Sequence, residues 1–214
     1  MGGSPENIVV YRLGGSAKLR EALARRHDLS TDFATQLCIM LPENWREELY
    51  RRFGLDKDEV AAINLYTKEN VANTEQSFFR VMNEAFNGDR SKAVPFFAYL
   101  QLFVGGARRL PNACPAKLWR AFPNLDPRWK ELYPKGQELF WWAFSSTTKR
   151  SEVLMEESFF GTEGERTLFM LDCVVGIDIS MYSDFPEDEV LLMPGSKFVV
   201  EQTMAPELLN GVLN

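Results

Sequence analysis

The spacing of apolar residues changes once along this chain, near Pro111, and this change limits the folds that it can adopt. Before Pro111, apolar residues recur at every third or fourth position, which is typical of amphipathic helices. After it, apolar and aromatic runs are short and are bounded by glycine and proline, which is typical of strands. Helices first and strands second is the order of an α+β protein. We therefore expect a helical N-terminal lobe followed by a core of β-strands.

The same patterns predict the individual elements. Helices are expected at residues 18–27, 33–41, 44–53, 56–67, 75–86 and 93–104. Strands are expected at residues 118–122, 138–144, 167–174, 189–193 and 197–201. The stretch Pro194-Gly195-Ser196 predicts a turn that joins the last two strands.

Composition disfavours several classes of protein. The 214 residues carry a net charge of −6, and the pI is near 5.0, which argues against a nucleic-acid-binding protein. The single histidine, His27, lies at a predicted exposed helix end, and the three cysteines are far apart, so neither a metal site nor a disulfide framework is expected. The cysteine usage indicates a reducing compartment. No apolar run approaches the roughly 20 residues of a membrane span, so none is expected.

Two glutamates stand at the start of the predicted strand at 189–193. If this stretch is extended, Glu187 and Glu189 share one face about 6.6 Å apart along the strand, while Asp188 points the other way. Two carboxylates on one face can divide their roles, because one can stay ionised to stabilise positive charge while the other acts as a base. The alternative for an isolated pair of this kind is a solvent-exposed start of a strand.

Three other stretches combine residues that can bind a ligand. Arg120 lies inside an apolar run, where arginine ordinarily has an anionic partner or a buried stem with an exposed head. The hydroxyl tract Ser145-Ser146-Thr147-Thr148 follows an aromatic run, and it can cap a turn or hold a carboxylate or a ribose. Phe159 and Phe160 precede Gly161, and they can close the core or stack on a flat ring.

Taken in order, these stretches resemble the arginine-specific mono-ADP-ribosyltransferases, the R-S-E class of the ADP-ribosyltransferase superfamily. Arg120 is similar to the first motif, Ser146-Thr147-Thr148 to the Ser-Thr-Ser motif, and Glu187-Asp188-Glu189 to the E-x-E motif. Residues 62–67 and 79–83 extend the similarity, which covers roughly residues 56 to 204. The resemblance implies an ADP-ribosyltransferase-type β-sandwich that uses NAD⁺ as its substrate, without a metal.

The resemblance also implies roles for these residues. Glu189 would stabilise the oxocarbenium-like cation that forms when nicotinamide leaves NAD⁺, and it would hold the ribose 2′-hydroxyl. Glu187 would orient an acceptor guanidinium and take its proton. Arg120 would pair with a phosphate of NAD, and Ser146 would hydrogen-bond Glu189 or the ribose. Further contacts to NAD are expected from Ala121, Thr147 and Phe160, and contacts to the target protein from Phe185 and Glu187.

The sequence is thus predicted to be an enzyme, a transferase that moves ADP-ribose from NAD to arginine side chains of a protein. The alternatives are an NAD glycohydrolase that uses the same site with water, and an inactive NAD-binding or interaction module. Residues 1–8 are expected to be a cloning remnant or a disordered tail, residues 9–55 a helical extension, and residues 56–214 the ADP-ribosyltransferase domain. We expect a cytoplasmic monomer, with a secreted toxin or effector that acts in a host cytosol as the alternative.

Overall fold

The computed structural model describes residues 52–68, 77–88, 90–122, 128–151, 167–183 and 188–203. The chain divides into two compact units. One comprises Met1–Pro111 with Met181–Pro186, and the other comprises Asn112–Ser180 with Glu187–Asn214. The first boundary falls at Pro111, where the apolar pattern changes from helical to strand-like. The predicted helices at 18–27 and 33–41, and most of the one at 44–53, lie outside the described residues.

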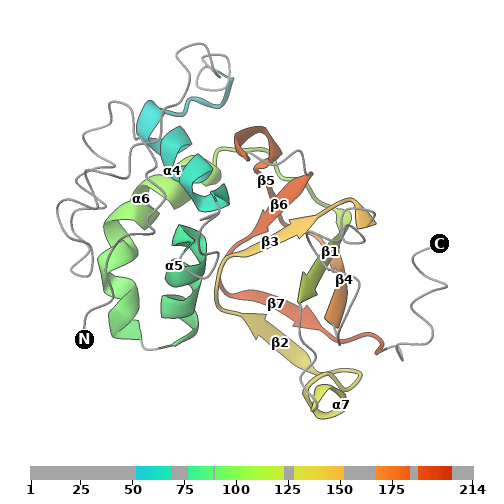
Figure 1. Cartoon of the computed structure of the whole chain (residues 1–214). Coiled ribbons are helices and arrows are strands. Elements are labelled where there is room, and N and C mark those ends of the chain that lie inside the picture. Colours follow the sequence, from blue (N-terminus) through green and yellow to red (C-terminus); the bar gives the residue numbers. More distant parts are fainter. Residues whose placement is uncertain are drawn as a thin grey trace. The chain divides into compact units, whose positions relative to one another are not determined.

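The described part of the first unit is helical (Figure 1). It contains α4 (Lys57–Thr67), α5 (Phe78–Asn87), the 3₁₀ helix η2 (Arg90–Phe96) and α6 (Phe97–Ala107). These correspond to the predicted helices at 56–67, 75–86 and 93–104. The last prediction was partly wrong, because the chain is a 3₁₀ helix until residue 96 and becomes α-helical only at residue 97. Pro95 lies in the 3₁₀ stretch, where its missing N–H and its ring disfavour regular α-helical hydrogen bonds.

Helix α4 begins at Asp56 because that residue and Glu59 form a capping box. The Asp56 side chain accepts a hydrogen bond from the Glu59 N–H at 2.9 Å, and the Glu59 side chain accepts one from the Asp56 N–H at 2.8 Å. The pair thereby satisfies two backbone donors that a helix start leaves open. Glu59 also forms an ion pair with Arg109, whose other guanidinium nitrogen donates to the Gly54 carbonyl at 2.7 Å.

Aromatic rings fill the core of the helical unit. The rings of Tyr66 and Phe103 stack with centroids 5.0 Å apart, and the ring of Tyr99 lies 4.6 Å from that of Phe78 in an edge-to-face arrangement. The Tyr99 hydroxyl is buried and donates to the Ala62 carbonyl at 2.8 Å. Burial, with a contribution from Tyr66, raises the pKa of Tyr99 well above its usual value. The hydroxyl therefore stays protonated and acts as a donor that ties α6 to α4.

A short segment from far along the chain also belongs to this unit. Tyr182 lies in the 3₁₀ helix η4 (Ser180–Tyr182), and its backbone carbonyl accepts a hydrogen bond from the Asn64 side chain of α4 at 2.7 Å. Both residues are buried, so the amide of Asn64 is matched to a backbone acceptor inside the core. This hydrogen bond holds the segment before residue 184 on the helical unit.

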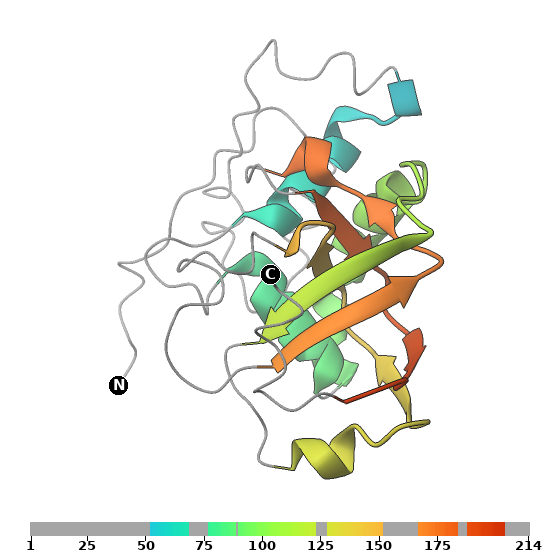
Figure 2. The same cartoon turned by 90° about the vertical axis from the view of Figure 1, so that its right-hand side faces the viewer.

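The second unit contains two antiparallel sheets. The five-stranded sheet has the order β4-β1-β3-β6-β5, and the other sheet pairs β2 with β7. The strands are β1 (Ala116–Phe122), β2 (Glu138–Trp141), β3 (Ser145–Thr148), β4 (Thr167–Cys173), β5 (Ile177–Asp178), β6 (Glu189–Leu192) and β7 (Ser196–Val199), with a short helix α7 (Trp129–Leu132) before β2. Figure 2 shows β1 and β4 running side by side.

The core of this unit lies between the two sheets. Strands of the larger sheet contribute a buried cluster made of Leu118, Leu171, Cys173, Val190 and Leu192. Trp141 of β2 and Phe198 of β7 pack against this cluster from the smaller sheet. The two sheets therefore form a β-sandwich, and the whole described chain is α+β, as predicted.

One strand prediction was wrong in its extent. The aromatic run at 138–144 ends as a strand at Trp141, and the hydroxyl tract after it forms a separate strand, β3, in the other sheet. The predicted turn between the last two strands is present at Pro194-Gly195, and the strands that it joins, β6 and β7, pair in different sheets. Gly195 has a φ of +83°, which side-chain-bearing residues rarely adopt. Both links carry the chain from one sheet to the other, a choice that depends on pairing with distant strands.

Within the described residues, no helix is long and apolar enough to cross a membrane.

Candidate active site

The order of the larger sheet brings together three of the predicted site residues. Arg120 lies on β1, Ser146 on β3 and Glu189 on β6, and these three strands are consecutive in the sheet. The sequence separates Ser146 from Glu189 by 43 positions, yet antiparallel pairing of β3 with β6 makes them close neighbours. The sheet order thus places a cation, a hydroxyl and a carboxylate on three neighbouring strands. Because Trp119 lies opposite Thr148, the Arg120 side chain projects from the other face of the sheet than Ser146 and Glu189.

The register of β3 and β6 decides which side chains share a face. Thr148 lies opposite Glu189, and Ser146 lies opposite Leu191. Because side chains alternate along a strand, Ser146 and Glu189 project from one face, and Thr147 and Val190 from the other. The Thr147 hydroxyl is buried there and donates to the Val190 carbonyl at 2.7 Å. The expected contact of Thr147 with NAD stays a prediction. In this structure the Thr147 hydroxyl joins β3 to β6.

Ser146 and Glu189 are in direct contact. The Ser146 hydroxyl donates to Glu189 Oε1 at 2.5 Å. The Glu189 residue is only 7% exposed, so its carboxylate depends on protein donors more than a surface carboxylate would. A charge-assisted hydrogen bond of this kind holds the carboxylate in one orientation. This is the contact expected if Ser146 positions Glu189.

Arg120 is tied to the same place through the backbone. Its Nη1 donates to the Ser146 carbonyl at 2.5 Å. The guanidinium carbon lies 4.7 Å from the centre of the Phe122 ring and 5.8 Å from that of Trp141. Aromatic faces attract a guanidinium and limit its orientations. Arg120 is therefore a partly buried and oriented cation, while the next residue, Ala121, continues β1 opposite Leu168.

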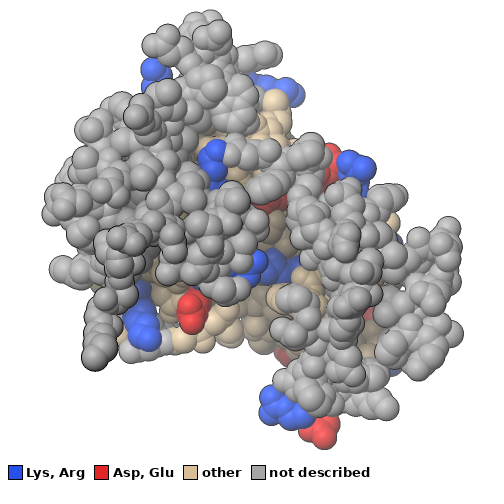
Figure 3. Space-filling model, viewed as in Figure 1, with Lys and Arg blue, Asp and Glu red and all other residues tan. Residues whose placement is uncertain are grey.

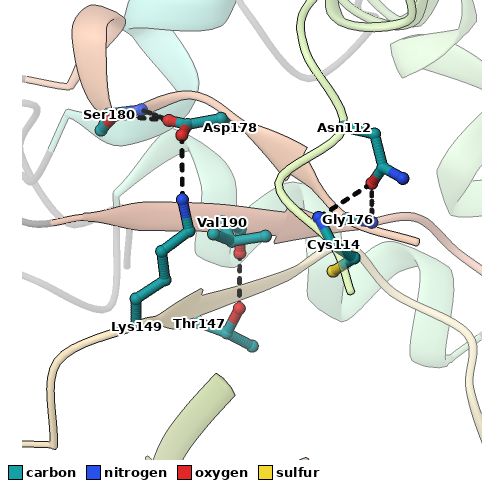
Figure 4. A network of polar contacts seen from close by, with 8 residues as sticks. All are labelled: Asn112, Cys114, Thr147, Lys149, Gly176, Asp178, Ser180 and Val190. Carbon is teal, nitrogen blue, oxygen red and sulfur yellow. Dashed lines mark hydrogen bonds and ion pairs between the residues drawn. The ribbon is translucent and has the colours of Figure 1, made fainter. Parts of the chain in front are cut away.

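The backbone around Glu189 is held from both sides. The Ile179 N–H donates to the Glu189 carbonyl at 3.1 Å, and the Lys149 N–H donates to the Asp188 carbonyl at 3.3 Å. The Lys149 side chain also lies 3.2 Å from a carboxylate oxygen of Asp178 (Figure 4). Sequence reasoning missed this ion pair. The only signal for it was the place of Lys149 directly after the hydroxyl tract.

The pKa of Asp178 reflects this arrangement. Burial alone would raise the pKa, but hydrogen bonds from Ser180 and Lys149, together with the positive charge of Lys149, more than offset burial and lower it below 3.8. Asp178 is therefore a carboxylate over the physiological range, and the ion pair persists there.

Glu187, Phe185 and Phe160 lie outside the described residues, so their roles stay predictions. Among the residues that are described, no cluster of histidine, cysteine, aspartate and glutamate could hold a metal ion. Burial, with contributions from Cys114 and Asp172, raises the pKa of Cys173 to about 11, so its thiol is protonated near neutral pH.

Charged residues of both signs are interspersed on the part of the surface that Figure 3 colours. In the strand unit, two lysines are also paired with acidic residues: Lys117 with Asp172, and Lys197 with Glu138. The coloured part of that face therefore shows no extended basic surface of the kind that tracks a nucleic-acid backbone.

No protein-family model and no curated protein matches this sequence. Solved structures do match. The ADP-ribosyltransferase HopU1 of Pseudomonas syringae pv. tomato DC3000 is similar with a TM-score of 0.60 at 19% identity, over 89% of this chain and 93% of HopU1. The Vis toxin, an ADP-ribosyltransferase from Vibrio splendidus, has a TM-score of 0.55 at 19% identity, over 73% of this chain and 72% of Vis.

A eukaryotic mono-ADP-ribosyltransferase, ART2.2, is also similar, with a TM-score of 0.59 at 17% identity, over 94% of this chain and 88% of ART2.2. Identities this low carry information on the fold and not on the activity. The chain has the α+β fold of the ADP-ribosyltransferases.

Proposed function

We propose that this protein is an NAD-dependent mono-ADP-ribosyltransferase that transfers ADP-ribose to arginine side chains of a protein and releases nicotinamide. The observation that carries the proposal is the hydrogen bond between Ser146 and Glu189, with Arg120 bonded to the same serine's backbone. A fold can host many activities, so the proposal rests on this site and on its agreement with the motifs in the sequence.

The chemistry suits one oriented carboxylate. Cleavage breaks the bond between the ribose C1′ and the nicotinamide nitrogen, and the electron pair leaves with nicotinamide, which departs neutral. Positive charge then builds on the ribose, as in glycoside hydrolysis. Glu189 would stabilise that charge, and Ser146 would hold the carboxylate in place so that little reorganisation is needed during the reaction. Arg120 would bind a phosphate of NAD with its guanidinium.

The acceptor step needs a second group. A guanidinium is protonated at neutral pH and is therefore a poor nucleophile. Glu187 would orient it and accept a proton as the nitrogen bonds to C1′. Two points support arginine as acceptor: the glutamate at the first position of the E-x-E motif, and the structure of the similar protein Vis in complex with agmatine, a guanidine. The proposed site of action is a cytosol, either that of the producing cell or that of a host, because some similar structures are named toxin or effector.

The test measures two products from NAD⁺ and agmatine: free nicotinamide and ADP-ribosyl-agmatine. The wild type is expected to form both. Glu189→Gln removes the charge and keeps the shape, and it should lower nicotinamide release by at least about a hundredfold. Glu187→Ala should abolish most adduct formation while nicotinamide release falls far less. A wild type that forms neither product would refute the proposal, and release without adduct would identify water as the acceptor.

Ser146→Ala tests the observation that carries the proposal. Without its hydroxyl, the Glu189 carboxylate loses the donor at 2.5 Å and can leave its oriented position. Removing one preorganised hydrogen bond of this kind typically lowers kcat by about tenfold or more. Ser146→Thr keeps a hydroxyl and should retain more activity than Ser146→Ala. Equal activity in the wild type and Ser146→Ala would show that the contact has no part in the reaction.

A further inference from the structure

The ion pair between Lys149 and Asp178 lies on the two strands that flank β6. Lys149 directly follows β3, and Asp178 is the last residue of β5. Both β3 and β5 pair with β6, which begins at Glu189. The ion pair thus connects the two neighbours of β6 at the end where Glu189 lies, and Figure 4 shows the Lys149 side chain extending past β6 toward Asp178.

The register places this connection behind the Ser146–Glu189 pair. Asp178 lies opposite Val190, so the two side chains share a face of the sheet. Glu189 precedes Val190 and projects from the other face. The ion pair therefore crosses the back of β6 without touching the Glu189 carboxylate, and any effect on that carboxylate passes through the backbone.

The backbone contacts that would transmit the effect come from the same two flanking segments. The Lys149 N–H bonds to the Asp188 carbonyl, and the Ile179 N–H bonds to the Glu189 carbonyl. One donor is the lysine of the ion pair itself, and the other directly follows Asp178. If the ion pair is lost, each flanking strand keeps its own bonds to β6, and this direct link between the two strands is removed.

Asp178 is itself held in place. Its other carboxylate oxygen accepts a hydrogen bond from the Ser180 N–H at 3.2 Å and one from the Ser180 hydroxyl. The side chains of Lys149 and Asp178 are 36% and 29% exposed, so the pair is partly shielded from solvent. A carboxylate with its rotamer already fixed loses less entropy when it binds a lysine than a free surface carboxylate does.

We propose that Lys149 and Asp178 form a positioning pair that fixes the backbone at Glu189, and thereby aims the Glu189 carboxylate for NAD⁺ cleavage. The catalytic half of this inference rests on the proposed function. The carboxylate acts on charge that develops in the transition state, so a small displacement lowers kcat more than it weakens NAD⁺ binding.

The experiment compares Lys149→Met and Asp178→Asn with Lys149→Arg, which keeps the charge. Lys117→Met is the matched control, because Lys117 and Asp172 form an ion pair of 3.0 Å across β1 and β4 of the same sheet. In Lys149→Met and Asp178→Asn, kcat for nicotinamide release should fall about tenfold while KM for NAD⁺ changes less than about twofold. Lys149→Arg and Lys117→Met should stay near the wild type. Combining Lys149→Met with Asp178→Asn should add little to either change alone.

A second readout does not require activity. Amide hydrogen exchange of residues 149 and 179 reports the two backbone bonds that hold Asp188 and Glu189. In Lys149→Met these two amides should exchange about tenfold faster. The amide of Leu171, which lies on β4 at the opposite edge of the sheet from β5, should exchange at an unchanged rate.

The outcomes separate the two proposals. Unchanged exchange at residue 179 in Lys149→Met would refute the positioning pair, whatever the activity. If the amide of Leu171 exchanged faster to the same degree, or if Lys117→Met lost as much activity, the effect would be a general loss of stability. Either result would also refute the positioning pair. A wild type that releases no nicotinamide would refute the proposed function, and faster exchange confined to residues 149 and 179 would still support the structural half of the inference.

Discussion

Two adjacent glycines in α6 should respond differently to alanine. Gly105 is exposed, and a Cβ placed on it would meet only Glu59 Oε1 at 3.8 Å, an ordinary contact. Gly106 is buried, and its Cβ would lie 3.0 Å from Glu59 Cβ and 3.3 Å from Ile63 Cδ1, both in α4. Alanine favours a helix over glycine by up to about 1 kcal/mol at either position. The two substitutions therefore share this gain and differ in the space that the new methyl group finds.

Glu59 cannot easily move away from the new group at Gly106. Its Cβ is attached to the backbone of α4, and its carboxylate both completes the capping box with Asp56 and pairs with Arg109. Forcing an extra carbon into a packed core typically costs about 1–3 kcal/mol. Gly105→Ala should thus stabilise the protein by up to about 1 kcal/mol, and Gly106→Ala should be less stable than Gly105→Ala by about 1–3 kcal/mol.

Urea unfolding followed by far-ultraviolet circular dichroism measures this difference, because the helical unit dominates that signal. Since both variants lose the same glycine flexibility in the unfolded chain, the difference between them isolates the packing term. Equal midpoints for the two variants, or a higher midpoint for Gly106→Ala, would show that α4 and α6 are not packed as closely as the structure has them.

Three further predictions follow from contacts in the two units. Gly176→Ala should lower the free energy of unfolding by more than about 1 kcal/mol, because its Cβ would lie 2.6 Å from Val190 Cγ1; a thermal melt equal to the wild type would contradict this. Tyr99→Phe should cost about 1 kcal/mol by removing the bond to the Ala62 carbonyl, and a urea midpoint at or above that of the wild type would argue against that bond. The lowered pKa of Asp178 stabilises the fold above the ordinary pKa of an aspartate, and this gain is lost as the pH falls through the lower folded pKa. Asp178→Asn should therefore be less stable than the wild type at pH 7, and the difference should shrink as the pH is lowered through that folded pKa. A difference that grows on acidification would refute the assigned sign.

Local chemistry made several elements predictable from sequence. The start of α4 at Asp56 could be predicted because a capping box involves residues only three positions apart. The strands β1 and β4 were expected from continuous apolar runs, and the structure places them within two residues of the predicted ends. The expected contact between Ser146 and Glu189 is present, although the roles of both residues in a reaction stay predictions.

The pairing of distant strands could not be predicted in the same way. Apolar alternation indicates that a stretch is a strand, but it does not name its partner. The run at 138–144 was therefore extended too far, because nothing local shows that the chain leaves one sheet after Trp141 and enters another at Ser145. The position of β6 between β3 and β5 is equally a result of the whole sheet.

The sequence by itself thus determined the α+β order and the residue types of the candidate site, since capping and apolar spacing act over a few residues. Only the tertiary structure decided that β6 lies between β3 and β5, that Glu189 meets Ser146, and that Lys149 reaches Asp178. A lysine after a hydroxyl tract and an aspartate at a strand end each look like ordinary surface charges when read alone. Their pairing has meaning only because hydrogen bonds between strands bring residues 29 positions apart to opposite sides of one catalytic candidate.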